Sequence, residues 1–148
     1  MTSEITLFTV GFVGKSAEQF FHLLVQAGVR RVIDVRLYNN SQLAGYTKCN
    51  DLEYFLKTIV GAEYLYLPNF APTKELLDGY KKKTISWQEY VRRYQNLLRY
   101  RQPRYEVDDT MLDRACLLCA ESTADQCHRR LAAEYLQNTW PNLTIKHL

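Results

Sequence analysis

The sequence predicts an α/β, Rossmann-like fold of three layers, in which a mostly parallel sheet of about five strands is flanked by helices. Two observations lead to this fold class. Apolar segments alternate with segments of helical periodicity along most of the chain, and the predicted strands are apolar on both faces, as strands buried in a parallel sheet are. The chain has 148 residues without a repeat or linker, so we expect a single domain over residues 1–148.

The first half of the chain alternates strand and helix. "EITLFTV" (4–10) has the composition of a buried strand and ends at Gly11. A helix follows, because Ser16 and Gln19 match a capping box and apolar residues recur at helical spacing until Gly28. The same criteria predict two further strands, 30–36 and 62–67, and between them a helix from Asn50, with Glu53 as its capping partner, to Gly61.

Two consecutive helices interrupt this alternation. "TKELLDGYKKK" (73–83) and "SWQEYVRRYQNLLRY" (86–100) both have helical periodicity, and Ser86 with Glu89 matches another capping box. The sequence therefore predicts a helical insertion between strands three and four. The last three elements are strand four (115–120), a helix from about Asp125 to Asn138 capped by Thr123 or Asp125, and a final strand (143–148).

Composition and charge exclude several classes of protein. Hydrophobic residues make up 47% of the chain and charged residues 24%, which fits a globular domain rather than a disordered chain. No apolar stretch approaches the roughly 20 residues that span a bilayer, and the N-terminus lacks the features of a signal peptide. We therefore expect a cytoplasmic protein without a membrane partner, whose four cysteines are free thiols. The oligomeric state stays open.

The predicted site lies at one edge of the sheet, because ligands of open α/β sheets bind beyond the carboxyl ends of the strands. The first strand brings Gly11 to this edge, the second brings Asp34 and Arg36, and the fourth brings Cys119 and Glu121. Asp34 and Glu121 are the candidate catalytic acid and base, and Arg36 is a candidate anion clamp, with Gly11 and Cys119 as further ligand-binding residues. Alternatively, Asp34 and Arg36 form a structural ion pair.

The start of the helix near residue 125 supplies the rest of the site. Its free amides, with His128 and Arg129, suit a phosphate or carboxylate. The same surroundings favour the thiolate form of Cys127, a third catalytic candidate. We expect His128 to change charge near neutral pH, so that anions bind better as the pH falls, and Arg129→Ala to leave the melting temperature nearly unchanged. The alternative is that Cys127 only fills space.

The histidines and cysteines do not predict a metal site. Cys116 and Cys119 are an odd number of residues apart on one strand, so their side chains point to opposite faces. Cys119 and Glu121 with Cys127 and His128 match no zinc spacing. We therefore predict no metal and no other cofactor, and expect the remaining histidines, His22 and His147, to be structural.

A basic segment over residues 80–105 allows a different function. Basic and aromatic side chains alternate there, which suits phosphate contacts and base stacking. The candidate nucleic-acid contacts are Lys81, Lys82, Lys83, Arg92 and Arg93. The alternative is a solvated pair of helices whose tyrosines pack on the core.

Four stretches of the sequence resemble a known family. "TVGFVGKSAEQF", "VIDVR", "APTKELLDGYKKKTISWQEYVRRY" and "LLCAESTADQCHRRLAAEYL" are similar to the bacterial and archaeal domain-of-unknown-function family 488 over nearly the whole chain. The most specific part is the Cys119-Ala120-Glu121 triplet followed by Cys127-His128-Arg129. The resemblance implies a cytoplasmic, single-domain α/β protein and no particular activity. The chain departs from the family at Phe12 and Val13, where relatives carry Tyr-Glu or His-Ser.

A second resemblance concerns cysteine chemistry. "VIDVR" is similar to the Asp-Val-Arg strand of rhodanese-like sulfurtransferases, whose catalytic cysteine follows a later strand, as Cys119 does here. The loop after Cys119 is longer than in that family. We therefore expect an enzyme or degenerate enzyme that binds a small anionic, nucleotide-like or nucleic-acid-derived ligand. The alternatives are rhodanese-like sulfur chemistry and a non-catalytic module that binds nucleic acid.

Overall fold

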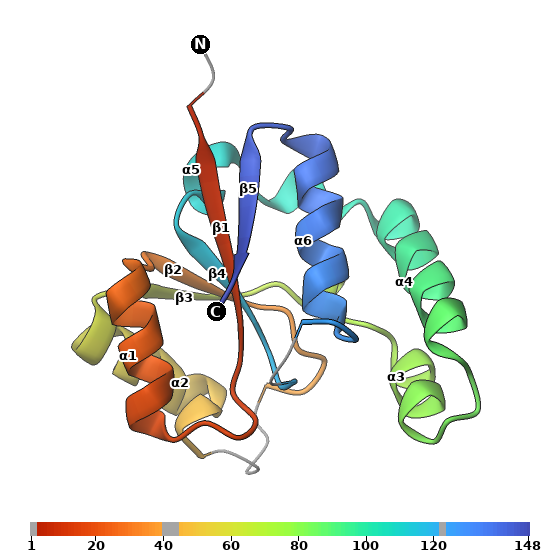
Figure 1. The fold of residues 1–148 in the computed structure, drawn as a ribbon, viewed down its shortest axis with the longest axis horizontal. Coiled ribbons are helices and arrows are strands. Elements are labelled where there is room, and N and C mark those ends of the chain that lie inside the picture. The colour runs from red at the N-terminus through yellow and green to blue at the C-terminus, as the bar shows by residue number, and fades with distance from the viewer. Residues whose placement is uncertain (1–2, 40–44, 122–123) are drawn as a thin grey trace.

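The computed structural model describes residues 3–39, 45–121 and 124–148. Five parallel strands form one sheet in the order β3-β2-β4-β1-β5 (Figure 1). The strands are β1 (Ile5–Gly11), β2 (Arg31–Asp34), β3 (Glu63–Tyr66), β4 (Ala115–Cys119) and β5 (Leu143–His147). The predicted fold class is confirmed.

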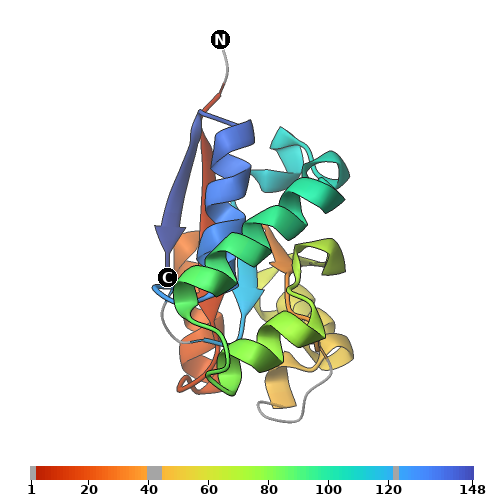
Figure 2. The same cartoon turned by 90° about the vertical axis from the view of Figure 1, so that its right-hand side faces the viewer.

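Helices cover both faces of the sheet. One face carries α1 (Ala17–Ala27) and α2 (Cys49–Phe55), which continues as a π-helical turn (Leu56–Val60). On the other face α6 (His128–Thr139) lies against the sheet, and α4 (Trp87–Arg101) packs on α6 (Figure 2). Between β3 and β4 the chain forms α3 (Lys74–Lys81), α4 and the short α5 (Asp109–Leu112), which confirms the predicted helical insertion.

The two faces of the sheet bury separate apolar cores. Towards α1 and α2, Val10, Val32 and Leu118 pack with the first two helices. Towards α6 and α4, Leu7 and Leu117 pack with the later helices. Cys116 belongs to the first core and Cys119 to the second, as their odd spacing predicted.

The helix caps confirm some predictions and correct others. Ser16 and Gln19 form the predicted capping box. Ser86 caps α4 by accepting from the Glu89 amide, but the second predicted capping box is only half formed, because the Glu89 carboxylate binds Arg92 and Arg93. The Asn50 cap is wrong, because the Cys49 amide is already bound to the Asn39 carbonyl at 2.8 Å and α2 starts at Cys49.

The start of α6 is also corrected. The helix begins at His128 rather than near Asp125, because a turn precedes it in which the Cys127 amide donates to the Ala124 carbonyl. Cys127 is the N-cap, and its sulfur accepts a hydrogen bond from the Arg129 amide at 3.5 Å. Asp125 is therefore not the cap, and Thr123 lies outside the described residues.

The topology leaves a natural binding position at the end of β4. Strand β4 lies between β2 and β1. The chain leaves β1 and β2 towards the α1 and α2 face but leaves β4 towards the α6 face. Connections that diverge to opposite faces open the crevice in which α/β proteins bind ligands. No helix within the described ranges is both long and apolar enough to cross a membrane.

Candidate functional site

A pocket of about 190 Å³ lies at the carboxyl end of β4, and we call it the β4 pocket. It combines Arg36, Cys119, Glu121, Cys127 and His128, which come from three separate parts of the predicted site. Its other lining residues are Phe12, Leu37, Tyr38, Pro72, Leu77, Lys81 and Ala120. Three predicted site residues, Gly11, Asp34 and Arg129, lie next to the pocket without lining it.

Asp34 and Arg36 form a buried ion pair behind the pocket wall. The Nε of Arg36 donates to Oδ1 of Asp34 at 2.8 Å, and Nη2 donates to Oδ2 at 2.7 Å. The hydroxyl of Tyr64 donates a further hydrogen bond to Oδ2 at 2.6 Å. This structural ion pair is the alternative to a catalytic role that the sequence left open. The carboxylate of Asp34, a candidate acid or base, is therefore already bound to Arg36 and Tyr64.

One nitrogen of Arg36 lacks a partner. Arg36 is only 4% exposed and its guanidinium lies over the Phe12 ring at 5.5 Å. Within the described chain, no group accepts a hydrogen bond from its Nη1. Burial works against the charge, but the hydrogen bonds and negative charge of Asp34 outweigh it and raise the pKa of Arg36. A buried cationic donor beside a pocket favours an anionic ligand there.

Cys119 and Cys127 form a sulfur pair at the pocket. Cys119 ends β4 and Cys127 caps α6, so the sheet and the helix bring their Sγ atoms into contact. Their Cα atoms are 7.9 Å apart, which is wider than disulfides span without backbone movement, and we therefore treat the pair as two adjacent sulfurs. The expected free thiols are found at Cys49 and Cys116. Burial raises the pKa of Cys116.

Arg129 points under the sulfur pair rather than into the pocket. It is 1% exposed, and its guanidinium donates to Oγ1 of Thr9 at 3.1 Å, to Sγ of Cys119 at 3.4 Å and to the carbonyl of Glu121. Burial lowers its pKa. This side chain joins β1, β4 and α6, so the structure argues against the expectation that Arg129→Ala leaves the melting temperature unchanged.

Gly11 makes room for this arrangement. A Cβ atom at this position would overlap the Glu121 carbonyl, and its distance to Nη1 of Arg129 would be 2.5 Å. The glycine is therefore needed for the close approach of the loop that follows β4, and it contributes to the site through packing.

His128 does not titrate near neutral pH. Its ring is buried and its Nε2 lies 2.8 Å from the Val35 carbonyl. Burial lowers the pKa of His128 to about 4, and the nearby charge of Arg129 adds to this effect. The expected change of charge near neutral pH is therefore wrong, and His128 presents a neutral ring to the β4 pocket.

The basic segment divides between the core and the surface. Tyr90 and Tyr94 of α4 are buried in the apolar core on the α6 side of the sheet, which removes them from any stacking with bases. Arg92 and Arg93 are exposed and both bind Glu89. Nucleic-acid binding by this segment stays a prediction.

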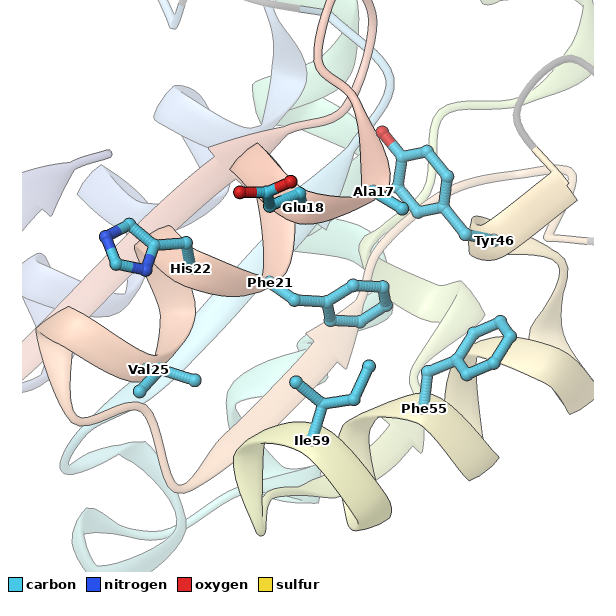
Figure 3. Close-up of a pocket in the computed structure, with 8 residues that line it drawn as sticks. All are labelled: Ala17, Glu18, Phe21, His22, Val25, Tyr46, Phe55 and Ile59. Atoms are coloured by element: carbon cyan, nitrogen blue, oxygen red, sulfur yellow. The ribbon is translucent and has the colours of Figure 1, made fainter.

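A second, apolar pocket lies on the opposite face of the sheet. It measures about 380 Å³ and lies between α1 and the α2 region. Figure 3 shows Phe21 and Ile59 pointing into the space between these helices, with His22 on α1 beside it. It contains none of the predicted site residues, so the β4 pocket is the candidate functional site.

The sequence did not reveal the place of Lys81 or a contact of His147. Lys81, which was grouped with the nucleic-acid contacts, lines the β4 pocket because α3 folds over the carboxyl edge. The position of the helical insertion after β3 was the signal that could have placed Lys81 there. His147 was expected to be structural, and its Nδ1 lies 2.5 Å from Oγ1 of the buried Thr9, which is compatible with that expectation. Nothing in the spacing of Thr9 and His147 indicates this contact.

The family described as "Domain of unknown function DUF488" matches residues 16–136, and the chain belongs to it. The matched region runs from the N-cap of α1 into α6 and includes the β4 pocket residues Arg36, Lys81, Cys119 and Cys127. Neither a curated protein nor a solved structure matches the chain.

Proposed function

We propose that this member of the DUF488 family is an enzyme that binds a small anion in the β4 pocket and reacts with it through the thiolate of Cys119. The proposal joins the two predictions from the sequence, anion binding at the sheet edge and rhodanese-like cysteine chemistry. The observation that carries it is the contact between Cys119, Cys127 and the buried guanidinium of Arg129.

The charge of Arg129 supports a thiolate at Cys119. A buried charge is costly unless an opposite charge lies close to it. Among the described residues no carboxylate forms an ion pair with Arg129. Its Nη1 donates to the neutral carbonyl of Glu121 and to Sγ of Cys119, and of these two only the sulfur can carry a negative charge. Deprotonated sulfur is both the missing counter-charge and the nucleophilic form of cysteine.

Two cationic groups support an anionic ligand. Arg36 contributes its Nη1, which has no acceptor within the described residues, and Lys81 contributes an ammonium group from α3. The volume of about 190 Å³ is below the roughly 300 Å³ at which pockets for drug-sized ligands begin. This size favours a compact anion over a whole nucleotide.

Cys127 supplies a second step. When Cys119 attacks an electrophilic sulfur of the ligand, the new S–S bond forms as the leaving group departs with the bonding electron pair. The Cys127 thiolate can then attack Sγ of Cys119 and release the transferred sulfur as hydrosulfide. The resulting Cys119–Cys127 disulfide requires the backbone to move, because the two Cα atoms are 7.9 Å apart, and an external thiol must reduce it before the next turnover. The ligand that supplies the electrophilic sulfur is the oxidant in this sequence.

Alkylation of the reduced protein tests the proposal. Mass spectrometry can follow the labelling of Cys119 by iodoacetate, which is anionic, and by iodoacetamide, which is neutral. We expect Cys119 to react faster than Cys49, and to prefer iodoacetate more strongly than Cys49 does. Lys81→Met should lower the iodoacetate rate at Cys119 about threefold to fivefold, with little change for iodoacetamide.

Lys82→Met is the matched control, because this neighbouring lysine is exposed and does not line the β4 pocket. It should leave both rates unchanged. Labelling of Cys119 that is slower than that of Cys49, with no preference for the anionic reagent, would contradict the proposal.

A further inference from the structure

A chain of hydrogen bonds connects the edge strand β5 to the sulfur pair. Nδ1 of His147 lies 2.5 Å from Oγ1 of Thr9, and the same oxygen accepts from Nε of Arg129 at 3.1 Å. Nη1 of Arg129 then donates to Sγ of Cys119 at 3.4 Å. The chain therefore runs from His147 on β5 through β1 and α6 to the end of β4.

Arg129 fixes one direction in this chain of hydrogen bonds. A guanidinium only donates, so Oγ1 of Thr9 accepts from Nε. The hydroxyl of Thr9 keeps one hydrogen and a second lone pair, and it can donate to Nδ1 of His147 in the tautomer that carries the ring proton on Nε2.

Thr9 is an unusual residue for its place in the sheet. It lies on β1 between Phe8 and Val10 and is completely buried. Valine has nearly the same shape and would fill this position without burying a hydroxyl group, which costs free energy unless it is hydrogen-bonded. The hydroxyl of Thr9 is thus explained by its two partners, Arg129 and His147.

We propose that Thr9 and His147 are positioning residues that hold the guanidinium of Arg129 against Cys119 and so keep Cys119 in its reactive form. This inference rests on the proposed function of Cys119 as a nucleophile. It assigns a role to Thr9 on β1 and His147 on β5, which neither line the β4 pocket nor touch the ligand.

Burial and the charge of Arg129 favour the neutral form of His147. Arg129, Arg130 and Glu134 on α6 and Asp125 before that helix act on the imidazole, whereas β1 carries no charged side chain over Ile5–Gly11. Burial, followed by the charge of Arg129, lowers the pKa of His147. The ring can therefore accept the Thr9 hydrogen bond at neutral pH.

The pH dependence of Cys119 alkylation tests the inference. With the reduced full-length protein and iodoacetamide, we expect Thr9→Val and His147→Phe each to move the midpoint of the rate profile upward by about one pH unit. This shift corresponds to about a tenfold lower rate below the midpoint. Thr9→Ser and His147→Asn should restore most of the rate, because both keep a group that can complete the chain.

A purely structural role predicts a different result. Thr9→Val would then lower the melting temperature without moving the midpoint, and this outcome would overturn the inference. The His147 variants keep the test decisive if Thr9→Val does not fold, because His147 lies on the exposed part of an edge strand. If Cys119 of the unmodified protein reacts no faster than Cys49, the proposed function itself fails, which is a separate outcome.

Discussion

The carboxyl end of β2 and the start of α6 each bury an arginine, and the two charges are balanced in different ways. Arg36 has a carboxylate partner, Asp34, in a two-point hydrogen-bonded pair. Arg129 has a threonine hydroxyl, a backbone carbonyl and the sulfur of Cys119. Of these three groups only the sulfur can become an anion.

The pKa values of the two arginines move in opposite directions. The hydrogen bonds and charge of Asp34 raise the pKa of Arg36 in spite of its burial, whereas burial lowers the pKa of Arg129. The carboxylate of Asp34 balances the charge of Arg36, which leaves only the hydrogen-bonding capacity of Nη1 for a ligand. A buried guanidinium beside a thiol stabilises the thiolate, and it therefore indicates where the chemistry of this protein takes place.

Removing the carboxylate of Asp34 should have the largest effect on the free energy of unfolding. Asp34→Asn leaves the charge of Arg36 buried without a counter-ion, so we expect the free energy of unfolding to fall by about 3–5 kcal/mol in urea titrations. The matched control is Glu63→Gln, which breaks the exposed pair between Glu63 and Arg31 and should cost less than about 1 kcal/mol. Equal losses in the two variants would show that Asp34 does not balance Arg36.

The next effect concerns His128, which is influenced by both Arg129 and Asp34. An unfolded histidine binds its proton near pH 6.5, whereas burial lowers the pKa of folded His128 to about 4. Between these two values the unfolded chain holds more protons. The free energy of unfolding should therefore fall by up to about 1.4 kcal/mol for each pH unit as the pH decreases through this window.

Urea titrations at several pH values measure this slope. His128→Gln keeps a donor that can reach the Val35 carbonyl and should reduce the slope between pH 4 and 6.5. His22→Gln, on the exposed side of α1, is the control and should leave the slope as it is. An unchanged slope in His128→Gln would show that this ring does not limit acid stability.

Arg129→Met should have a smaller effect than Asp34→Asn. Methionine fills much of the same space and leaves no carboxylate unpaired, so we expect a loss of about 1–2 kcal/mol from the broken hydrogen bonds. Arg130→Met is the control, because Arg130 is only loosely paired with Glu134 at 3.8 Å, and it should cost less than about 1 kcal/mol. If Arg129→Met lowers the free energy of unfolding as much as Asp34→Asn does, the claim that no carboxylate balances Arg129 is contradicted.

The sequence predicted the layers of this fold better than the details of its site. Apolar runs bounded by polar or glycine residues located the five strands, most clearly the buried strands β1 and β4, whereas the edge strands β3 and β5 are partly exposed. The rule that ligands bind beyond the carboxyl ends of the strands brought Arg36, Cys119 and Cys127 to one edge.

The direction of individual side chains could not be read from the pattern. Arg129 turns under the sheet end because the missing side chain of Gly11 leaves space there, and the two residues are far apart in sequence. Cys127 rather than Asp125 caps α6, because Asp125 lies inside the turn that the Cys127 amide closes on the Ala124 carbonyl. Such long-range contacts depend on packing, which local propensity does not encode.

The ionisation state of Cys119 tests the central claim most directly. In the reduced protein, the chemical shift of its Cβ carbon can be followed by nuclear magnetic resonance as the pH changes, with Arg129→Met measured in parallel. We expect the thiolate signal at neutral pH in the unmodified protein and the thiol signal at the same pH in Arg129→Met. A thiol signal at neutral pH in both proteins would contradict the claim that Cys119 balances the buried charge of Arg129.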